Sequence, residues 1–242
     1  MANTLDLALQ FLTEDMDIID LSHTLEEGIP CWPTHARFGK TLYESYRWGD
    51  VACHYQLVLS EHSGTHMDAP LHFIQEGKAH YGMDRVGLNR VYGRGVRIDA
   101  SHLGVNGLLK KSDITTWEVS HGAIRAGDIV LVRFGWEDRW ALRPHDGDFT
   151  RDWPGLSRDG AEYLVERGVK AVGTDALAID AFNSEDNPAH YTLLGNEVYI
   201  IENLCNLRQL PDFFLFAAFP LKVRDGSGSP VRAVAFVERK VS

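Results

Sequence analysis

The segment His62–His72, with the sequence HSGTHMDAPLH, constrains this chain more than any other part of it. Three histidines and one aspartate fall within it at spacings of four, two and four residues. Imidazole and carboxylate groups are the ligands that zinc and similar divalent ions prefer, and histidine is the usual proton carrier near neutral pH. The segment therefore predicts a metal site with a general base beside it.

The first two histidines of the segment, His62 and His66, can bind one metal ion only if the backbone between them reverses. On a straight strand His62 and His66 would lie roughly 13 Å apart, whereas donor atoms on one metal ion lie about 3–4 Å apart. A helix is disfavoured, because Gly64 and Pro70 are poor residues for a helix interior. We therefore expect a sharp turn at 63–65, where Gly64 can adopt a backbone conformation that a Cβ would forbid.

The other candidate ligands and proton carriers have separate roles. His66 and Asp68 are two residues apart and can share one face of a strand. His72 lies beyond a proline and is free to act as the general base. Glu202 ends an apolar run, and a buried carboxylate there needs a metal, a proton shared with a substrate, a helix N-terminus or a salt bridge. His190 follows a polar loop and can supply a further ligand.

Composition and charge exclude several classes of protein. The chain has 242 residues, of which 44% are hydrophobic and 24% charged, as in an ordinary globular protein. A net charge of −10 disfavours nucleic acid as a partner. No apolar run approaches the ~20 residues that span a bilayer, so no membrane partner is expected. The three cysteines are scattered, without a CxxC pair, and residues 1–20 lack a basic leader region, which indicates a cytoplasmic protein.

Apolar runs of strand length recur along the chain, whereas helical patterns are few. The clearest helix spans Ser157–Arg167, and residues 1–16 form a short amphipathic helix at the N-terminus. The stretch 134–155 has the composition of a long surface loop. We find no linker, so we expect one α/β domain, residues 1–242, with a mixed β-sheet. The expected strands are 18–21, 55–59, 95–99, 128–133, 169–173, 198–202, 214–218 and 231–237.

The residues His62–Phe73 also resemble a known family signature. They fill every fixed position of HxGTHxDxPxHF, the signature of the cyclase superfamily, which includes bacterial kynurenine formamidases, isatin hydrolases and some lactam hydrolases. Shorter segments of the chain are similar to other family motifs, so that the resemblance covers about residues 17–239. These segments are Cys31-Trp32-Pro33, Gly127–Leu131, Gly173–Asp180 and Glu202-Asn203-Leu204.

The resemblance implies a swivelling β/β/α arrangement, a homodimer or higher homo-oligomer, and one or two divalent ions, Mn²⁺ or Zn²⁺. The ligands that it implies are His62, His66 and Asp68, with His190 and Glu202 completing a second position that Asp68 bridges. His72 matches the family's catalytic histidine, and Glu202 is a second candidate catalytic residue, able to pass a proton to the leaving nitrogen. Trp32 and Phe73, with other aromatic residues such as Trp48, are candidates to stack on a planar substrate.

We therefore expect a metal-dependent hydrolase that cleaves the C–N bond of a small amide with metal-activated water. The long 134–155 stretch favours a cyclic or aryl amide similar to isatin. N-formylkynurenine, a lactam or a cyclic imide are the alternative substrates. Two alternatives belong to different classes: a metal-dependent dehydratase or cyclase, and a non-catalytic metal-binding protein. An open coordination position that faces a cavity would distinguish an enzyme from a non-catalytic metal-binding protein.

Overall fold

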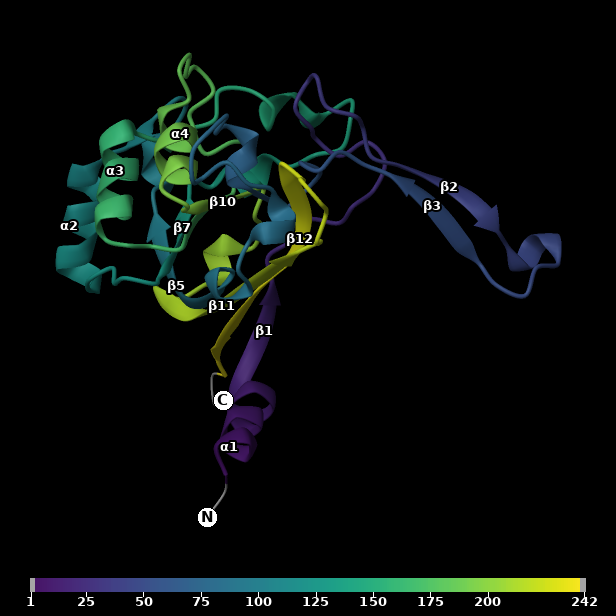
Figure 1. Ribbon diagram of the computed structural model, residues 1–242, viewed down its shortest axis with the longest axis horizontal. Helices are drawn as coiled ribbons and strands as arrows, with labels where there is room; N and C mark the ends of the chain where they lie inside the picture. Colours follow the sequence, from purple (N-terminus) through teal and green to yellow (C-terminus); the bar gives the residue numbers. More distant parts are fainter. Residues whose placement is uncertain (1–2, 240–242) are drawn as a thin grey trace.

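The computed structural model describes residues 3–239, which form a single mixed α/β domain around one large sheet (Figure 1). The eight strands are ordered β1-β12-β11-β5-β7-β9-β10-β4, and β4 also pairs with β12, so that the sheet closes on itself. Their bounds are β1 Met16–Asp20, β4 His66–Asp68, β5 Tyr92–Asp99, β7 Ile129–Arg133, β9 Ala171–Thr174, β10 Tyr199–Glu202, β11 Phe213–Pro220 and β12 Gly228–Glu238. The predicted fold class is confirmed.

Burial on both faces explains the composition of the central strands. Strands β5, β7, β9 and β10 run parallel to one another, and all five residues of β7 are buried. Val130 and Val132 face one apolar cluster that includes residues of the helices, whereas Ile129 and Leu131 face a second cluster inside the closed sheet. Such strands read as continuous apolar runs rather than as alternating patterns, which is why the sequence identified them.

Three helices pack together on one side of the sheet (Figure 1). They are α2 Lys111–His121, α3 Arg158–Glu166 and α4 Pro188–Gly195. The predicted helix at 157–167 is α3, and the Ser157 hydroxyl caps it by accepting from the N–H of Gly160. Within residues 3–239 no helix is long and apolar enough to cross a lipid bilayer.

The prediction of a surface loop at 134–155 is wrong. Its backbone forms short helical turns at Trp136–Arg139 and Asp146–Asp148 and ends in the short strand β8 Gly155–Leu156, which pairs with β6 Leu108–Leu109. Four aromatic side chains of this stretch are buried in the core, namely Phe134, Trp136, Phe149 and Trp153. The indole N–H groups of Trp136 and Trp153 donate to backbone carbonyls, which allows these large side chains to be buried.

The predicted N-terminal helix is present and largely exposed. Helix α1 spans Thr4–Gln10 and continues as a wider turn over Phe11–Asp15, and residues 1–2 of the predicted helix lie outside the described part of the chain. No side chain of α1 is buried. Most of the apolar stripe that predicted the helix is therefore exposed to solvent, and α1 projects from the domain beyond β1 (Figure 1).

A second projection was not predicted as a unit. Strands β2 Gly39–Glu44 and β3 His54–Val58 pair with each other in a two-stranded hairpin that extends away from the domain (Figure 1). We call residues 39–58 the arm. Trp48, which the sequence suggested as a stacking residue, lies near the tip of the arm and is exposed.

Candidate metal centre

The predicted backbone reversal before β4 is confirmed. Gly64 has φ +58°, and a Cβ on it would lie 2.7 Å from the side chain of Leu25. The turn brings the ring centroids of His62 and His66 to 5.0 Å from each other. The Asn203 side-chain amide donates to the Gly64 carbonyl over 3.0 Å, which fixes the turn to the end of the neighbouring strand β10. Asn203 is a residue whose role the sequence analysis missed.

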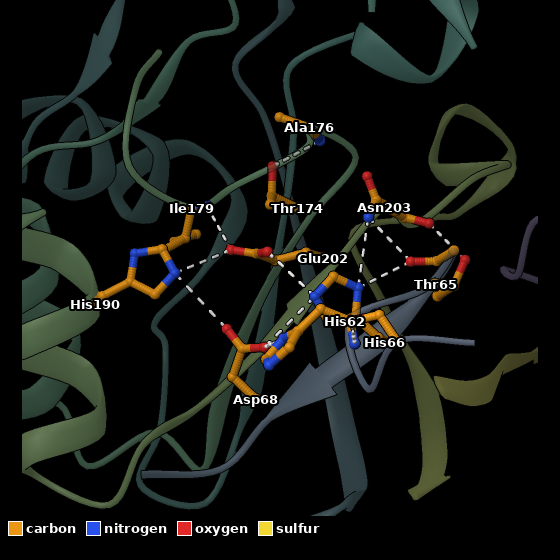
Figure 2. Close-up of polar contacts among 12 residues, drawn as sticks. His62, Thr65, His66, Asp68, Thr174, Ala176, Ile179, His190, Glu202 and Asn203 are labelled. Atoms are coloured by element: carbon orange, nitrogen blue, oxygen red, sulfur yellow. Dashed lines mark hydrogen bonds and ion pairs between the residues drawn. The ribbon is translucent and has the colours of Figure 1, made fainter. Parts of the chain in front are cut away.

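Strand pairing brings the acidic ligands to the turn. Strands β4 and β10 are antiparallel neighbours, with Glu202 opposite His66 and Ile200 opposite Asp68. Because side chains alternate between the faces of a strand, Glu202, His66 and Asp68 project to one face (Figure 2). Asp68 is completely buried, and Glu202 is nearly so.

The hydrogen bond of His66 leaves one ring nitrogen free for a ligand. Its Nδ1 lies 2.8 Å from the Gly64 carbonyl oxygen, which can only accept, so Nδ1 carries the hydrogen. Its Nε2 lies 3.5 Å from Asp68 Oδ1 and 3.4 Å from Glu202 Oε2. An imidazole held in this way presents its Nε2 lone pair when neutral, as metal-binding histidines do.

His190 is held in the same manner from the opposite side. Its Nδ1 lies 2.6 Å from Asp180 Oδ2, and its Nε2 faces Glu202 Oε1 at 3.3 Å and Asp68 Oδ2 at 3.7 Å (Figure 2). Asp180 also accepts the backbone N–H groups of Ala189 and His190 at the start of α4. The sequence placed His190 after a polar loop, but it lies on a helix, and the orienting role of Asp180 was not predicted.

His62 is placed differently from His66. Its Nδ1 lies 2.8 Å from Asp68 Oδ1, and its Nε2 lies 2.9 Å from the Ser227 hydroxyl, so both ring nitrogens are engaged. Its ring stacks on that of His72, with 4.1 Å between centroids. The possible ligand atoms thus form two groups that share Asp68: His62 with His72, and His66 with Glu202.

The donor set fits a divalent cation. Within residues 3–239, Asp68 Oδ2 is a buried oxygen without any hydrogen-bond partner, and two buried carboxylates lie together among imidazoles. Such a set requires positive charge nearby, which a cation or bound protons can supply. The Nε2 atoms of His66 and His190 each lie 3.3–3.7 Å from an oxygen of Asp68 and an oxygen of Glu202. Ligand atoms of His66, Asp68 and Glu202 also lie within 4.8 Å of one another, a spacing that one ion can bridge.

The pKa shifts of the buried histidines also show that the carboxylates require positive charge nearby. Burial alone would lower the pKa of His190, but its hydrogen bonds to Asp180 and Glu202 outweigh burial and raise the pKa to about 10. The pKa of His66 is raised in the same way, chiefly by Glu202 and Asp68. Protons on these imidazoles therefore neutralise the carboxylates in the metal-free protein, and a metal must displace them.

His72 has the opposite property. Burial lowers the pKa of its imidazole to about 4, so that it is neutral at pH 7 and able to accept a proton. It lies on a short helical turn, Pro70–His72, immediately after β4. The side chain of Phe73 contacts it edge-on and stacks on His190, with 4.3 Å between centroids.

A cavity of about 190 Å³ opens onto these groups. The two predicted stacking residues, Trp32 and Phe73, both line it, and Leu177 and Ala178 add to its apolar wall. His35 and Asn187 are polar lining residues that the sequence analysis missed. Within the described residues the buried Nδ1 of His35 has no hydrogen-bond partner, so the cavity has apolar walls and polar groups placed for a small ligand.

We expect Asp180→Asn to weaken metal binding by about 10–100-fold, the usual effect of losing a group that orients a metal-binding histidine. The neutral amide fills the same space but no longer stabilises the oriented, electron-rich imidazole of His190. Competition with a chromophoric chelator measures the affinity. Asp186→Asn, on an exposed carboxylate that pairs with Arg158, is the matched control. An affinity equal to that of the control would show that Asp180 does not position a ligand.

Comparison with known proteins identifies the family. Residues 19–181 match the Cyclase family. The chain is 33% identical to a kynurenine formamidase of Erythrobacter litoralis over 218 residues, which cover 90% of this chain and 92% of the relative. It is 29% identical to an isatin hydrolase of Roseibium aggregatum, with 96% of each chain covered. The crystal structure of an isatin hydrolase bound to the product analogue thioisatinate superposes with a TM-score of 0.90 at 26% identity, covering 99% of this chain and 100% of that one. These likenesses confirm the predicted resemblance: the chain belongs to the Cyclase family.

Proposed function

We propose that this protein is a metal-dependent amidohydrolase that cleaves the C–N bond of a small cyclic aryl amide similar to isatin. One observation carries the proposal. His66, Glu202 and His190 line a cavity whose walls include Trp32, and the two imidazoles both face the completely buried carboxylate of Asp68. A structural metal site is closed by protein ligands and has no cavity above it, so this arrangement favours an enzyme over a non-catalytic metal-binding protein.

The metal we propose is Mn²⁺ or Zn²⁺, because the donor set combines imidazole nitrogens with carboxylate oxygens. His66, His190, Asp68 and Glu202 would hold it, and His62 would join them through Asp68 if a second ion binds, since Asp68 belongs to both groups of ligands. When bound, the ion would lower the pKa of a coordinated water and polarise the amide carbonyl.

We assign the proton transfers to His72 and Glu202. The neutral imidazole of His72 accepts a proton from the attacking water, whose oxygen forms the new bond to the carbonyl carbon. As the C–N bond breaks, that proton passes to the leaving nitrogen, either from His72 itself or through Glu202. The products are a carboxylic acid and an amine, which in a cyclic amide remain in one molecule. Trp32 and Phe73 would position the aromatic ring.

The lining of the cavity favours an isatin-like substrate over N-formylkynurenine. Among the described residues, those that line the cavity include no lysine or arginine. N-formylkynurenine has a charged amino-acid end whose carboxylate needs a cationic partner, whereas isatin is neutral and planar. The relatives include enzymes named for each activity, so both compounds belong in the test.

Purified protein loaded with Mn²⁺ or Zn²⁺ tests the proposal. We expect hydrolysis of isatin with kcat/KM at least about tenfold above that of N-formylkynurenine, since an unpaired buried carboxylate costs more than 1.4 kcal/mol. In ¹⁸O-labelled water the product should gain one labelled oxygen. A dehydratase or cyclase would give no such label. The absence of turnover of either compound by fully loaded protein would contradict the proposal.

The proposal also covers the domain organisation, the assembly and the location of the protein. We infer one catalytic domain over residues 1–242, a homodimeric assembly, and a cytoplasmic location. The location is supported by the cysteines Cys31, Cys53 and Cys205, which are all free thiols.

A further inference from the structure

A second cavity lies at the opposite end of strand β10 from the metal centre. Its volume is about 370 Å³, which is within the range of small-molecule binding sites. Tyr199, the first residue of β10, lines this second cavity, whereas Glu202, the last residue, lines the cavity above the metal centre. The two residues are about 10 Å apart along the strand and project to opposite faces of the sheet. The proposed function uses no residue of the second cavity.

Three cationic side chains line the second cavity, and none of them is paired with an acid. They belong to Lys78, Arg85 and Arg90, and within residues 3–239 no carboxylate lies within ion-pair distance of any of them. The chain as a whole has a net charge of −10, so this group of cations contrasts with the rest of the molecule. Unpaired cations around a concave surface attract an anion.

Among the described residues that line the second cavity, the one acidic side chain is bonded to a neutral donor instead of to these cations. Oε1 of Glu197 accepts a hydrogen bond of 3.0 Å from the Tyr81 hydroxyl. Because that bond uses the hydrogen of Tyr81, the Tyr199 hydroxyl donates to the Tyr81 oxygen, over 2.8 Å. Burial, together with the contact with Tyr199, raises the pKa of Tyr81 far above its ordinary value, so its hydroxyl keeps its hydrogen. The cations therefore stay available to a ligand.

The same two tyrosines position the arginine side chains. The guanidinium carbon of Arg85 lies 5.3 Å from the ring centroid of Tyr81, and that of Arg90 lies 5.8 Å from the ring centroid of Tyr199. Arg90 also donates to the backbone carbonyl of Glu197 over 2.6 Å. A guanidinium group that is already positioned loses less conformational entropy when it binds an oxyanion, and its planar set of donors matches the geometry of phosphate.

We propose that the second cavity binds a phosphoryl group, either as free phosphate or as part of a small phosphomonoester. The lining residues carry three positive charges and one negative charge, which leaves a charge of +2. A phosphate group carries about −1.5 to −2 near neutral pH and so compensates that charge, whereas a monocarboxylate would compensate half of it. Arginine also binds phosphate through two parallel hydrogen bonds, which adds specificity to the attraction between charges.

The ligand should also stabilise the folded chain. Its three cationic contacts lie on one irregular segment, residues 78–90, which contains only two short helical turns. Like charges on this segment repel one another until an anion binds. Because a ligand of the folded chain alone shifts the unfolding equilibrium, we expect the melting temperature to rise by roughly 5 °C at a hundredfold excess of ligand over its dissociation constant.

Isothermal titration of the metal-loaded protein with inorganic phosphate tests the proposal. The variant Arg85→Gln/Arg90→Gln removes two of the three cations, and we expect its dissociation constant to be at least about tenfold above that of the wild type. Arg125→Gln/Arg139→Gln is the matched control, because it removes the same charge from exposed arginines outside the second cavity. It should bind phosphate like the wild type. Any phosphate bound at the metal centre is common to all three proteins, so the difference between them reports the second cavity.

A single substitution provides the test if the double variant does not fold. The side chain of Lys78 is exposed, so Lys78→Gln should leave the fold intact and raise the dissociation constant for phosphate at least about threefold. Titration with phenyl phosphate distinguishes the two sources of the phosphoryl group. Binding tighter than that of inorganic phosphate indicates an ester as the ligand, and weaker binding indicates the free anion.

Three results would overturn the proposal. They are a wild type that binds no phosphate, cavity variants that bind phosphate like the control, and tighter binding of malonate, a dianion with two carboxylates, than of phosphate. None of these measurements requires turnover, so a failure here leaves the proposed function untouched. Conversely, a protein that binds phosphate as expected but hydrolyses no amide supports the phosphoryl site, and the proposed function alone fails.

Discussion

Replacing Asp68 by asparagine should abolish stoichiometric metal binding and lower kcat/KM for isatin by about 10³-fold or more, the equivalent of several kcal/mol of transition-state stabilisation. The substitution keeps the volume of the side chain but removes its negative charge. Asp68 belongs to both groups of possible ligand atoms, and its Oδ2 has no hydrogen-bond partner within residues 3–239. Its loss therefore affects every ion that the site can hold. Elemental analysis after dialysis gives the metal content, and isatin turnover gives the rate.

The control for this prediction is Asp148→Asn. The side chain of Asp148 is 79% exposed and pairs with Arg151 on the surface, so that metal content and turnover should remain as in the wild type. An Asp68→Asn protein that retains one metal per chain and near-normal turnover would show that the ion, if one binds, does not depend on this carboxylate.

The variant His72→Ala should keep its metal but lose about 10²–10⁴-fold in kcat, the usual contribution of a general base. The wild-type profile of kcat/KM against pH should also show the pKa of this group. Burial lowers the pKa of His72 to about 4, so the active neutral form should persist below pH 6.5, the ordinary pKa of histidine. Activity should fall only as the pH approaches that lowered value, where the imidazole gains a proton. Stopped assays across pH 4–8 measure this.

Two results would count against this role for His72. One is full activity of the alanine variant with its metal in place. The other is an acidic limb that remains unchanged in the variant, since that limb should disappear with its titrating group. The exposed His102 provides the control substitution His102→Ala, for which we expect no change in either measurement.

The sequence predicted which residues come together at the site, but it did not predict which ring nitrogen of each histidine is available to a ligand. The spacing of His62 and His66 required a reversal at Gly64, and that reversal is present. Glu202 ends a buried apolar run and so required a partner, which the structure supplies in His66. Spacing cannot show which ring nitrogen is free. That depends on contacts such as the Gly64 carbonyl on His66 and the Ser227 hydroxyl on His62, which come from the turn and from the bend just before β12.

The prediction of a surface loop at 134–155 failed because it rested on the polar composition of the stretch, whereas a few large buried side chains determine its structure. The stretch 134–155 contains many charged and glycine residues, yet Trp136, Phe149 and Trp153 anchor it in the core. Asp175, which is completely buried, accepts three backbone N–H groups at the start of the stretch and so orders it. Contacts of this kind join residues far apart in the chain, so local patterns do not reveal them.

The three-residue strand β4 has a consequence for folding. It closes the sheet by pairing with β10 on one edge and with the first residues of β12 on the other. Both partners are distant in the sequence, and pairings between distant segments form slowly. This strand carries His66 and Asp68, so these two residues come together with Glu202 only when β4 has paired with β10. An ion that joins β4 to Glu202 on β10 would, by mass action, also hold the last edges of the sheet together.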